Sequence, residues 1–234
     1  MLNALTIHQR LFEFYGHPEW SKPSSPLDEL IVTVLSQNTN DKNRDRAFQA
    51  LKERFPTWVM VRDADPSAVI DAIRSAGLAN QKGQRIQAIL QAISDQRNQE
   101  NAGQDLFDLN FLAKLSPQEA RQWLMQFKGV GPKTAAIVML FSLGMPAFPV
   151  DTHIYRITGR LGLRPANMSV EQAHAHLEAQ FPPEAYTAAH LNLIRLGREI
   201  CQARRPNCPV CPLRDICDYG STHNSSFCVI GDKF

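Results

Sequence analysis

The amino-acid sequence predicts an all-α protein, and three observations lead to this fold class. The alternation of apolar and polar residues that marks a β-strand is nearly absent. Apolar residues recur instead at spacings of three and four, as they do along one face of a helix. Prolines stand where these stretches begin, a position that suits the fixed φ angle of proline. From typical helix and loop lengths we expect roughly ten helices.

The periodic apolar residues are expected to pack in the core of the protein. They form three stripes: Leu27, Leu30, Ile31 and Val34; Ile86, Ile89, Leu90 and Ile93; and Ile154, Ile157 and Leu161. The prolines that precede or open helical stretches are Pro26, Pro66, Pro117, Pro132 and Pro183.

Two connecting segments suggest a division into two helical domains. One segment, at 23–26, follows the first helical stretch, and the other spans 141–149. We therefore expect a central domain at residues 27–143. The terminal domain would combine residues 1–26 with residues 144–234.

Composition places the chain among ordinary globular proteins rather than strongly basic ones. It has 25 basic and 23 acidic residues in 234, so any nucleic-acid surface must come from local placement of charge. No apolar run is long enough to cross a bilayer, and residues 1–16 lack the apolar stretch of a signal peptide. These features lead us to expect a cytoplasmic protein, associated with the nucleoid if the source is bacterial.

A glycine-rich turn at Phe127–Ala136 reads FKGVGPKTAA. Gly129 and Gly131 flank one apolar residue, Val130, which is expected to plug into the core. Helical stretches precede and follow the turn, so the unit is a helix–hairpin–helix. Backbone N–H groups exposed by glycine, backed by a helix N-terminus, suit a DNA phosphate. The alternative is a simple turn between helices.

Lys133 is the chemically interesting side chain of this turn. Pro132 suits the first helical position, which puts Lys133 in the first turn, where the helix dipole disfavours an ammonium. Partial burial would lower the pKa of the amine further, so that it could act as a nucleophile. The alternative is a solvated surface lysine.

Asp151 precedes the stripe that begins at Ile154 and suits the N-cap position of a helix. A carboxylate there could also take a proton from Lys133 or stabilise positive charge on a sugar. Capping and catalysis are compatible roles for one side chain.

Four cysteines, Cys201, Cys208, Cys211 and Cys217, follow the pattern C-x6-C-x2-C-x5-C. A reducing compartment disfavours disulfides, so clustered cysteines there indicate a metal site. Their spacing allows either tetrahedral zinc or a [4Fe–4S] cluster. Arg204 and Arg205 lie in the loop between the first two cysteines and are candidates to contact DNA phosphates. Cys228 is left over, as a free thiol or a tail residue.

The chain resembles the endonuclease III family of DNA glycosylases over about residues 25 to 220. The motifs that carry the resemblance are LSQNTND at 35–41, GLANQKGQRI at 77–86, GVGPKTA at 129–135, VDTHIYR at 150–156 and the cysteine pattern. Their ordered combination is highly specific. Hairpin and later aspartate alone would indicate only the wider superfamily.

The resemblance implies a bifunctional enzyme that binds double-stranded DNA in a cleft between two helical domains. Lys133 would be the Schiff-base nucleophile and Asp151 the essential carboxylate. The enzyme would remove damaged, oxidised pyrimidines and then cut 3′ to the abasic site by β-elimination. The metal would be a [4Fe–4S] cluster held by the four cysteines, and a monomer would suffice.

The resemblance also implies that two side chains enter the duplex and fill the space that the extruded nucleotide leaves. One is Leu78. The other is usually a glutamine, and here position points to Asn38 while residue type points to Gln37, so both stay candidates.

Some residues depart from the family pattern or distinguish its branches. Pro132 stands where many relatives have a basic residue, and Lys128 stands where a proline is usual. Residues 32–34 hold no carboxylate, unlike the related adenine glycosylases. Two rival functions are a DNA-binding module without enzymatic activity and a mismatch glycosylase without lyase activity. Lys133 argues against both rivals, and Asp151 adds to the case against the first.

Overall fold

The computed structural model describes residues 3–19, 25–100 and 105–222, and this part of the chain contains helices and loops but no strands. The predicted all-α fold class is confirmed. The chain separates into two compact units, one formed by residues 1–21 and 146–234 and the other by residues 22–145. No helix among the described residues is long and apolar enough to cross a membrane.

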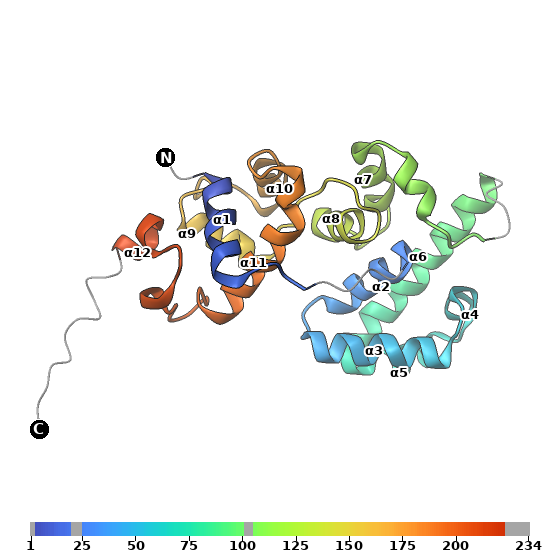
Figure 1. The fold of residues 1–234 in the computed structure, drawn as a ribbon. Coiled ribbons are helices and arrows are strands. Elements are labelled where there is room, and N and C mark those ends of the chain that lie inside the picture. The colour runs from blue at the N-terminus through green and yellow to red at the C-terminus, as the bar shows by residue number, and fades with distance from the viewer. Residues whose placement is uncertain (1–2, 20–24, 101–104, 223–234) are drawn as a thin grey trace, which may run out of the picture. The chain divides into compact units, whose positions relative to one another are not determined.

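The central unit contains seven of the described α-helices (Figure 1). They are α2 (Pro26–Ser36), α3 (Asp41–Arg54), α4 (Trp58–Asp63), α5 (Pro66–Ala72), α6 (Ala79–Gln99), α7 (Pro117–Met125) and α8 (Pro132–Phe141). Two 3₁₀ turns, η1 (Arg74–Ala76) and η2 (Asn110–Lys114), lie between them.

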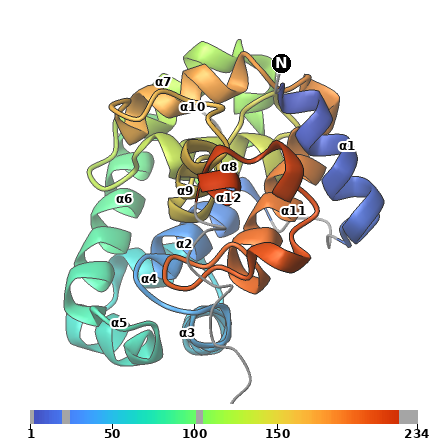
Figure 2. The same cartoon turned by 90° about the vertical axis from the view of Figure 1, so that its left-hand side faces the viewer.

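The unit built from both chain ends contains the other five described α-helices, with α1 packed against α11 (Figure 2). They are α1 (Ala4–Tyr15), α9 (Thr152–Arg160), α10 (Val170–Glu178), α11 (Tyr186–Glu199) and α12 (Asp218–Thr222). The 3₁₀ turns here are η3 (Pro183–Ala185), η4 (Cys208–Val210) and η5 (Arg214–Ile216).

The core of the central unit follows the predicted stripes. All members of the stripes on α2 and α6 are at most 2% exposed. Helix α8 is apolar on nearly all sides and packs against both α2 and α7. A helix enclosed in this way has little freedom to shift, so residues at its first turn are held in place.

The prolines predicted to open helices lie at the first positions of helices. Pro26, Pro66, Pro117 and Pro132 each begin an α-helix. Pro183 begins the 3₁₀ turn that leads into α11.

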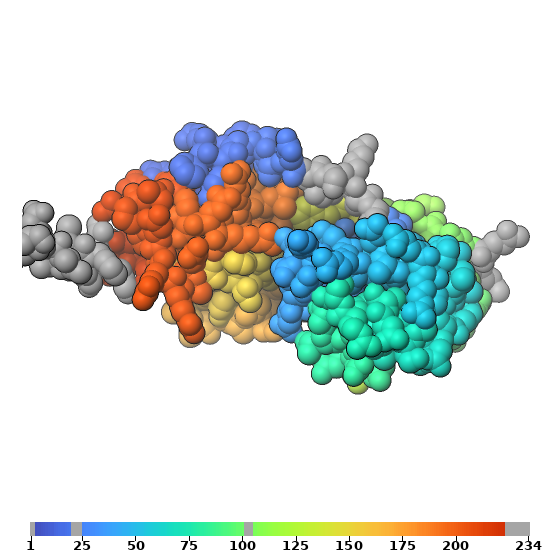
Figure 3. All heavy atoms as spheres, turned by 90° about the horizontal axis from the view of Figure 1, so that it is seen from below, coloured from blue at the N-terminus to red at the C-terminus, as the bar shows by residue number. Residues whose placement is uncertain are grey.

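The described residues contain twelve α-helices where roughly ten were expected, and some of the twelve are short. Helices α4 and α5 are 6 and 7 residues long, too short for a full amphipathic repeat to show in the sequence. Residues of α5 pack against α3, and the two contribute to one continuous surface in Figure 3.

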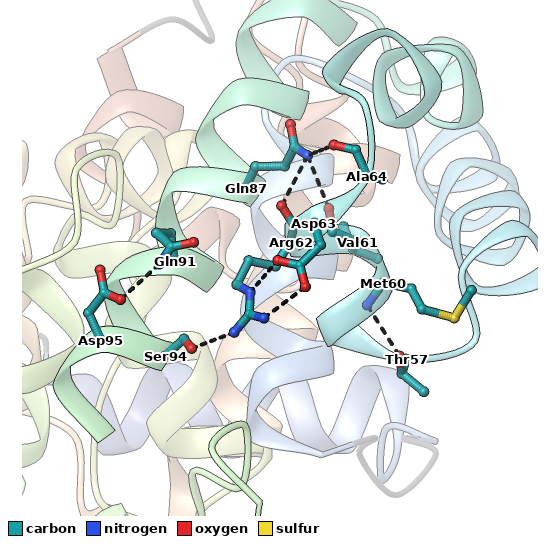
Figure 4. Close-up of polar contacts among 10 residues, drawn as sticks. All are labelled: Thr57, Met60, Val61, Arg62, Asp63, Ala64, Gln87, Gln91, Ser94 and Asp95. Atoms are coloured by element: carbon teal, nitrogen blue, oxygen red, sulfur yellow. Dashed lines mark hydrogen bonds and ion pairs between the residues drawn. The ribbon is translucent and has the colours of Figure 1, made fainter. Parts of the chain in front are cut away.

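Helix α4 is held against α6 by polar side chains (Figure 4). The Gln87 amide donates to the carbonyl oxygens of Val61, Arg62 and Ala64, at 3.1, 3.4 and 2.8 Å. These carbonyls lie at the end of α4, where the helix itself supplies no donors. The Arg62 guanidinium donates to Ser94 Oγ at 2.6 Å, which ties the same turn to a point two helical turns further along α6.

Three aromatic side chains pack together in the core of the terminal unit. The Phe148 ring stacks on Phe181 with centroids 4.7 Å apart, and the Tyr186 ring meets its edge at 5.4 Å. The third predicted stripe is buried here as well, with Ile154, Ile157 and Leu161 at most 2% exposed.

Candidate active site

The turn between α7 and α8 has the predicted form of a hairpin between two helices. The N–H of Val130 donates to the Phe127 carbonyl at 3.0 Å, and the Val130 side chain is only 5% exposed. Gly129 adopts a φ of +91°, which is strained for residues with a Cβ. Val130 therefore anchors the turn while Gly129 reverses the chain.

Gly131, unlike Gly129, has a backbone conformation that does not require glycine. Its φ of −95° and ψ of −179° are open to most residues, and a Cβ built there would meet no atom within 4 Å. Gly131 is the N-cap of α8 and offers no side chain to accept a hydrogen bond from the first-turn N–H groups. The hairpin thus presents an uncapped helix N-terminus, a favourable place for an anion.

Lys133 lies in the first turn of α8 and is partly exposed, while its neighbours Thr134, Ala135 and Ala136 are buried. The buried neighbours fix the helix, and the lysine stem leaves it at the hairpin. Lys133 thus stays partly exposed in the helical turn that carries the uncapped N–H groups.

Asp151 is the N-cap of α9, as its place in the sequence indicates. Its Oδ1 accepts a hydrogen bond from the N–H of Ile154 at 2.8 Å. Because Ile154 is fully buried, this bond fixes the orientation of the carboxylate. No described residue donates to Oδ2, so this oxygen remains available.

Two non-glycine residues of the central unit have left-handed backbones at exposed loop tips. Asn38 follows α2 with a φ of 54°, and Leu78 precedes α6 with a φ of 49°. Leu78 is 51% exposed, which is unusual for a large apolar side chain. Such backbones are costly for a leucine, so they point to a functional constraint.

Gln37, the other amide candidate, faces inward instead. Its Oε1 accepts a hydrogen bond from Arg85 at 2.6 Å, and its Nε2 donates to the Gly129 carbonyl at 3.5 Å. Arg85 also lies over Gly129, since a Cβ there would come within 2.3 Å of the Arg85 Nε. Gln37 thus links the end of α2 to the hairpin, and Asn38 is left as the exposed amide.

Lys82 is a residue that sequence reasoning missed. It is 2% exposed and donates to the carbonyl oxygens of Leu35 and Ala76, at 2.7 and 2.8 Å. A signal existed, because Lys82 precedes Ile86, Ile89 and Ile93 at helical spacing and so falls on the buried face of α6.

The four predicted cysteine ligands gather in the loop that follows α11. The pKa of the Cys211 thiol is raised to about 11, chiefly by burial and in part by the thiols of Cys201, Cys217 and Cys208. The four side chains are thus close enough to influence one another. Among the described residues, however, no group of three or more His, Cys, Asp or Glu is placed to hold a metal ion. Cys228 lies outside the described residues.

Two arginines of α9, which the sequence did not single out, hold the cysteine loop. The Arg160 guanidinium donates to Cys201 Sγ at 3.2 Å and to the carbonyl oxygens of Gln202 and Ala203. The Arg156 guanidinium donates to the Cys201 carbonyl at 3.1 and 2.8 Å. These hydrogen bonds thus fix the start of the loop at Cys201.

Arg204 and Arg205, predicted from sequence to contact phosphate, are both exposed in this loop. Arg205 has a left-handed backbone, with a φ of 54°. The structure therefore leaves both guanidinium groups open to solvent.

Comparison with known proteins places these features in one family. The description HhH-GPD superfamily base excision DNA repair protein matches residues 31–183. Endonuclease III of Sulfolobus acidocaldarius is 34% identical over 209 residues, 88% of each chain. The Escherichia coli endonuclease III is 32% identical over 216 residues, 92% of this chain and 94% of that one.

The solved structures agree. A trapped endonuclease III–DNA covalent intermediate has a TM-score of 0.79 and 28% identity, covering 95% of this chain and 99% of that one. A non-covalent endonuclease III–DNA complex has a TM-score of 0.78 over similar coverage. The chain therefore belongs to the endonuclease III family of base excision repair DNA glycosylases, within the HhH-GPD superfamily.

Proposed function

We propose that this DNA glycosylase is bifunctional: it removes oxidised pyrimidines and then cuts the strand 3′ to the abasic site. One observation carries the proposal. Lys133 is accessible in the first turn of a buried helix, beside a hairpin with an uncapped N-terminus. The N–H groups can hold a DNA phosphate while the amine reaches the adjoining sugar.

In the proposed chemistry, the Lys133 amine attacks C1′ of the damaged nucleotide, and the bond from C1′ to the base breaks. The base leaves with the proton that the amine nitrogen gives up. Asp151 stabilises the positive charge that builds on the sugar, through the Oδ2 that its N-cap bond leaves available. The bond from C1′ to the ring oxygen then breaks, that oxygen takes a proton from water, and a protonated imine joins Lys133 to C1′. Loss of a proton from C2′ of this imine breaks the bond from C3′ to oxygen, which cuts the strand.

The base must leave the helical stack before Lys133 can reach C1′, and unstacking takes a few kcal/mol. We propose that Leu78 and Asn38 fill the space it leaves. Both residues are exposed at loop tips where the backbone is left-handed. Leu78 would insert an apolar side chain into the duplex, and Asn38 would insert an amide. The inward hydrogen bonds of Gln37 argue against it as the inserted amide.

We further propose that Cys201, Cys208, Cys211 and Cys217 hold a [4Fe–4S] cluster. Four thiolates are a ligand set that suits tetrahedral zinc or such a cluster, and the membership of the chain in the endonuclease III family favours the cluster.

Hydrogen bonds to sulfur in this loop fit a cluster as well. Arg160 donates to Cys201 Sγ, and the N–H of Gly220 donates to Cys217 Sγ at 3.4 Å. Donors of this kind stabilise the negative charge of cluster thiolates. We assign the cluster to ordering the loop that presents Arg204 and Arg205 to DNA phosphates.

The relatives support a covalent route, since one similar structure is a trapped covalent intermediate of endonuclease III with DNA. We propose that the two compact units are the functional domains, with duplex DNA bound across both. We also propose that the enzyme acts as a monomer in the cytoplasm, on the nucleoid if the source is bacterial.

Borohydride trapping tests the lyase proposal. Duplexes with thymine glycol, uracil or an abasic site are incubated with the protein and borohydride, which reduces an imine to a stable adduct. We expect an adduct that Lys133→Ala abolishes and that Lys128→Ala, a lysine change in the same hairpin, leaves intact. Asp151→Asn should bind DNA but remove bases very slowly. Absence of any adduct with all three duplexes would refute the lyase activity.

A further inference from the structure

The loop that ends in Asn38 and the loop that ends in Leu78 share one buried cation. Lys82 is 2% exposed, and its ammonium donates to the carbonyl oxygens of Leu35 and Ala76. Leu35 lies three residues before Asn38, and Ala76 lies two residues before Leu78. One side chain therefore bridges the bases of both loops.

Neither carbonyl has a partner within its own helix, because each helix ends there. At the end of α2, the N–H groups of Gln37 and Thr39 bond to the carbonyls of Val34 and Ser36, which passes over Leu35. At the end of η1, the N–H of Gly77 bonds to the Arg74 carbonyl, which passes over Ala76. A cation is also favoured at a helix C-terminus such as that of α2.

The backbone of Lys82 adds a third link. Its N–H donates to the Leu78 carbonyl at 3.0 Å, which begins helix α6. The residue thus holds Leu78 through its main chain and the residues before both tips through its side chain. Burying an ammonium is unfavourable, and burial lowers the pKa of Lys82 while Arg85 lowers it further. A methionine would fill the same space without that penalty, but it would leave the carbonyls of Leu35 and Ala76 unpaired, so the charge serves to hold the bases of the two loops together.

Arg85 lies one turn further along α6 and extends this arrangement to the hairpin. It bonds Gln37 and lies over Gly129. From α6, two cations therefore fix the Asn38 loop, the Leu78 loop and the turn that precedes Lys133.

We propose that Lys82 is a positioning residue that sets the two tips so that Leu78 and Asn38 enter the duplex together. The inference rests on the proposed insertion of these side chains. Lys82 itself touches neither the damaged base nor the sugar. Its loss should therefore impair opening of the duplex while leaving the reactivity of Lys133 toward an already accessible sugar.

The test compares wild-type protein with Lys82→Met on two substrates. An abasic site in single-stranded DNA needs no extrusion, whereas thymine glycol in a duplex does. A misplacement of about 1 Å can lower a rate on the order of 100-fold. We expect a roughly 10- to 100-fold loss on the duplex, with borohydride trapping on single-stranded DNA within about threefold of wild type.

A fluorescent base reports the opening step without chemistry. In a duplex with 2-aminopurine beside a stable abasic analogue, unstacking brightens the fluorophore. Wild-type protein should brighten it and Lys82→Met should not. Lys52→Met is a suitable control, because the Lys52 ammonium also has partners, near Asp28 and over the Trp58 ring. It lies 11 residues into α3, about 16 Å from the helix start that follows Asn38, and should behave as wild type.

Three results would overturn the proposal. Lys82→Met could match wild type on the duplex, or it could lose single-stranded trapping in the same proportion, which would indicate a general structural role. Lys82→Met could also lower duplex activity by the same factor in a protein that already carries Leu78→Ala and Asn38→Ala, which would show that Lys82 does not act through these two side chains. If wild-type protein forms no adduct with either substrate, the lyase proposal fails instead, and the fluorescence measurement still decides the role of Lys82.

Discussion

Replacing Gly129 with alanine should destabilise the fold, whereas the same change at Gly131 should weaken DNA binding. A left-handed backbone costs an alanine about 1–2 kcal/mol. The new Cβ would also stand 2.3 Å from the Arg85 Nε and 2.5 Å from its Cδ, so the flexible Arg85 side chain must move. Its hydrogen bond to Gln37 Oε1 would then break.

The energy of that bond can be estimated from its surroundings. A hydrogen bond to a charged group contributes about 1.5–3 kcal/mol, but Arg85 is partly exposed and solvent screens it, so we take about 1 kcal/mol. Gly129→Ala should therefore lower the free energy of unfolding by about 2–3 kcal/mol in urea titrations.

Gly131→Ala is the matched control. Its backbone is extended and its surroundings are open, so the only expected cost is that of alanine at an N-cap, up to about 1 kcal/mol. The methyl group would occupy the space through which a phosphate approaches α8. This variant should stay folded but bind duplex DNA more weakly. Equal stability of Gly129→Ala and wild type, or a larger loss in Gly131→Ala, would refute the reasoning.

Three further predictions concern the loop tips, the cysteine loop and the half-buried carboxyl of Glu29. Asn38→Gly, which keeps a residue that tolerates the φ of 54°, should hardly change the melting temperature but should reduce 2-aminopurine brightening. Gln37→Ala should lower the melting temperature because it breaks links to the hairpin. Cys211→Ser should yield protein without the broad visible absorption of an iron–sulfur cluster, and a colourless, zinc-loaded wild type would contradict the cluster. Burial raises the pKa of Glu29 above its ordinary value of 4.5, so the folded state keeps a proton that the unfolded state releases, and stability falls as the pH rises through this region. Glu29→Gln should therefore lose less melting temperature than wild type between about pH 4 and pH 7; an equal loss would contradict the assignment.

The sequence predicted those parts of the fold that arise from local chemistry. The stripes on α2, α6 and α9 needed only helical periodicity, and the opening prolines needed only the fixed φ and missing donor of proline. The buried Val130 and the N-cap Asp151 were predicted for the same reason, since each depends on residues within four positions.

What the sequence could not predict depends on contacts between distant segments. The links from Lys82 to Leu35 and from Arg85 to Gln37 span 47 and 48 residues, and a lysine in a helix gives no sign of its partners. The same holds for Gly129 and Gly131, which look alike in sequence. Only the chain around them shows that one needs a positive φ while the other keeps space open.

Mapping the covalent adduct identifies the residue that attacks the sugar. The borohydride-trapped complex with abasic duplex DNA is digested with nuclease and protease, and tandem mass spectrometry locates the sugar remnant. We expect the remnant on Lys133, in the first turn of α8. A remnant on another amine, such as Lys128 of the same hairpin, would contradict it.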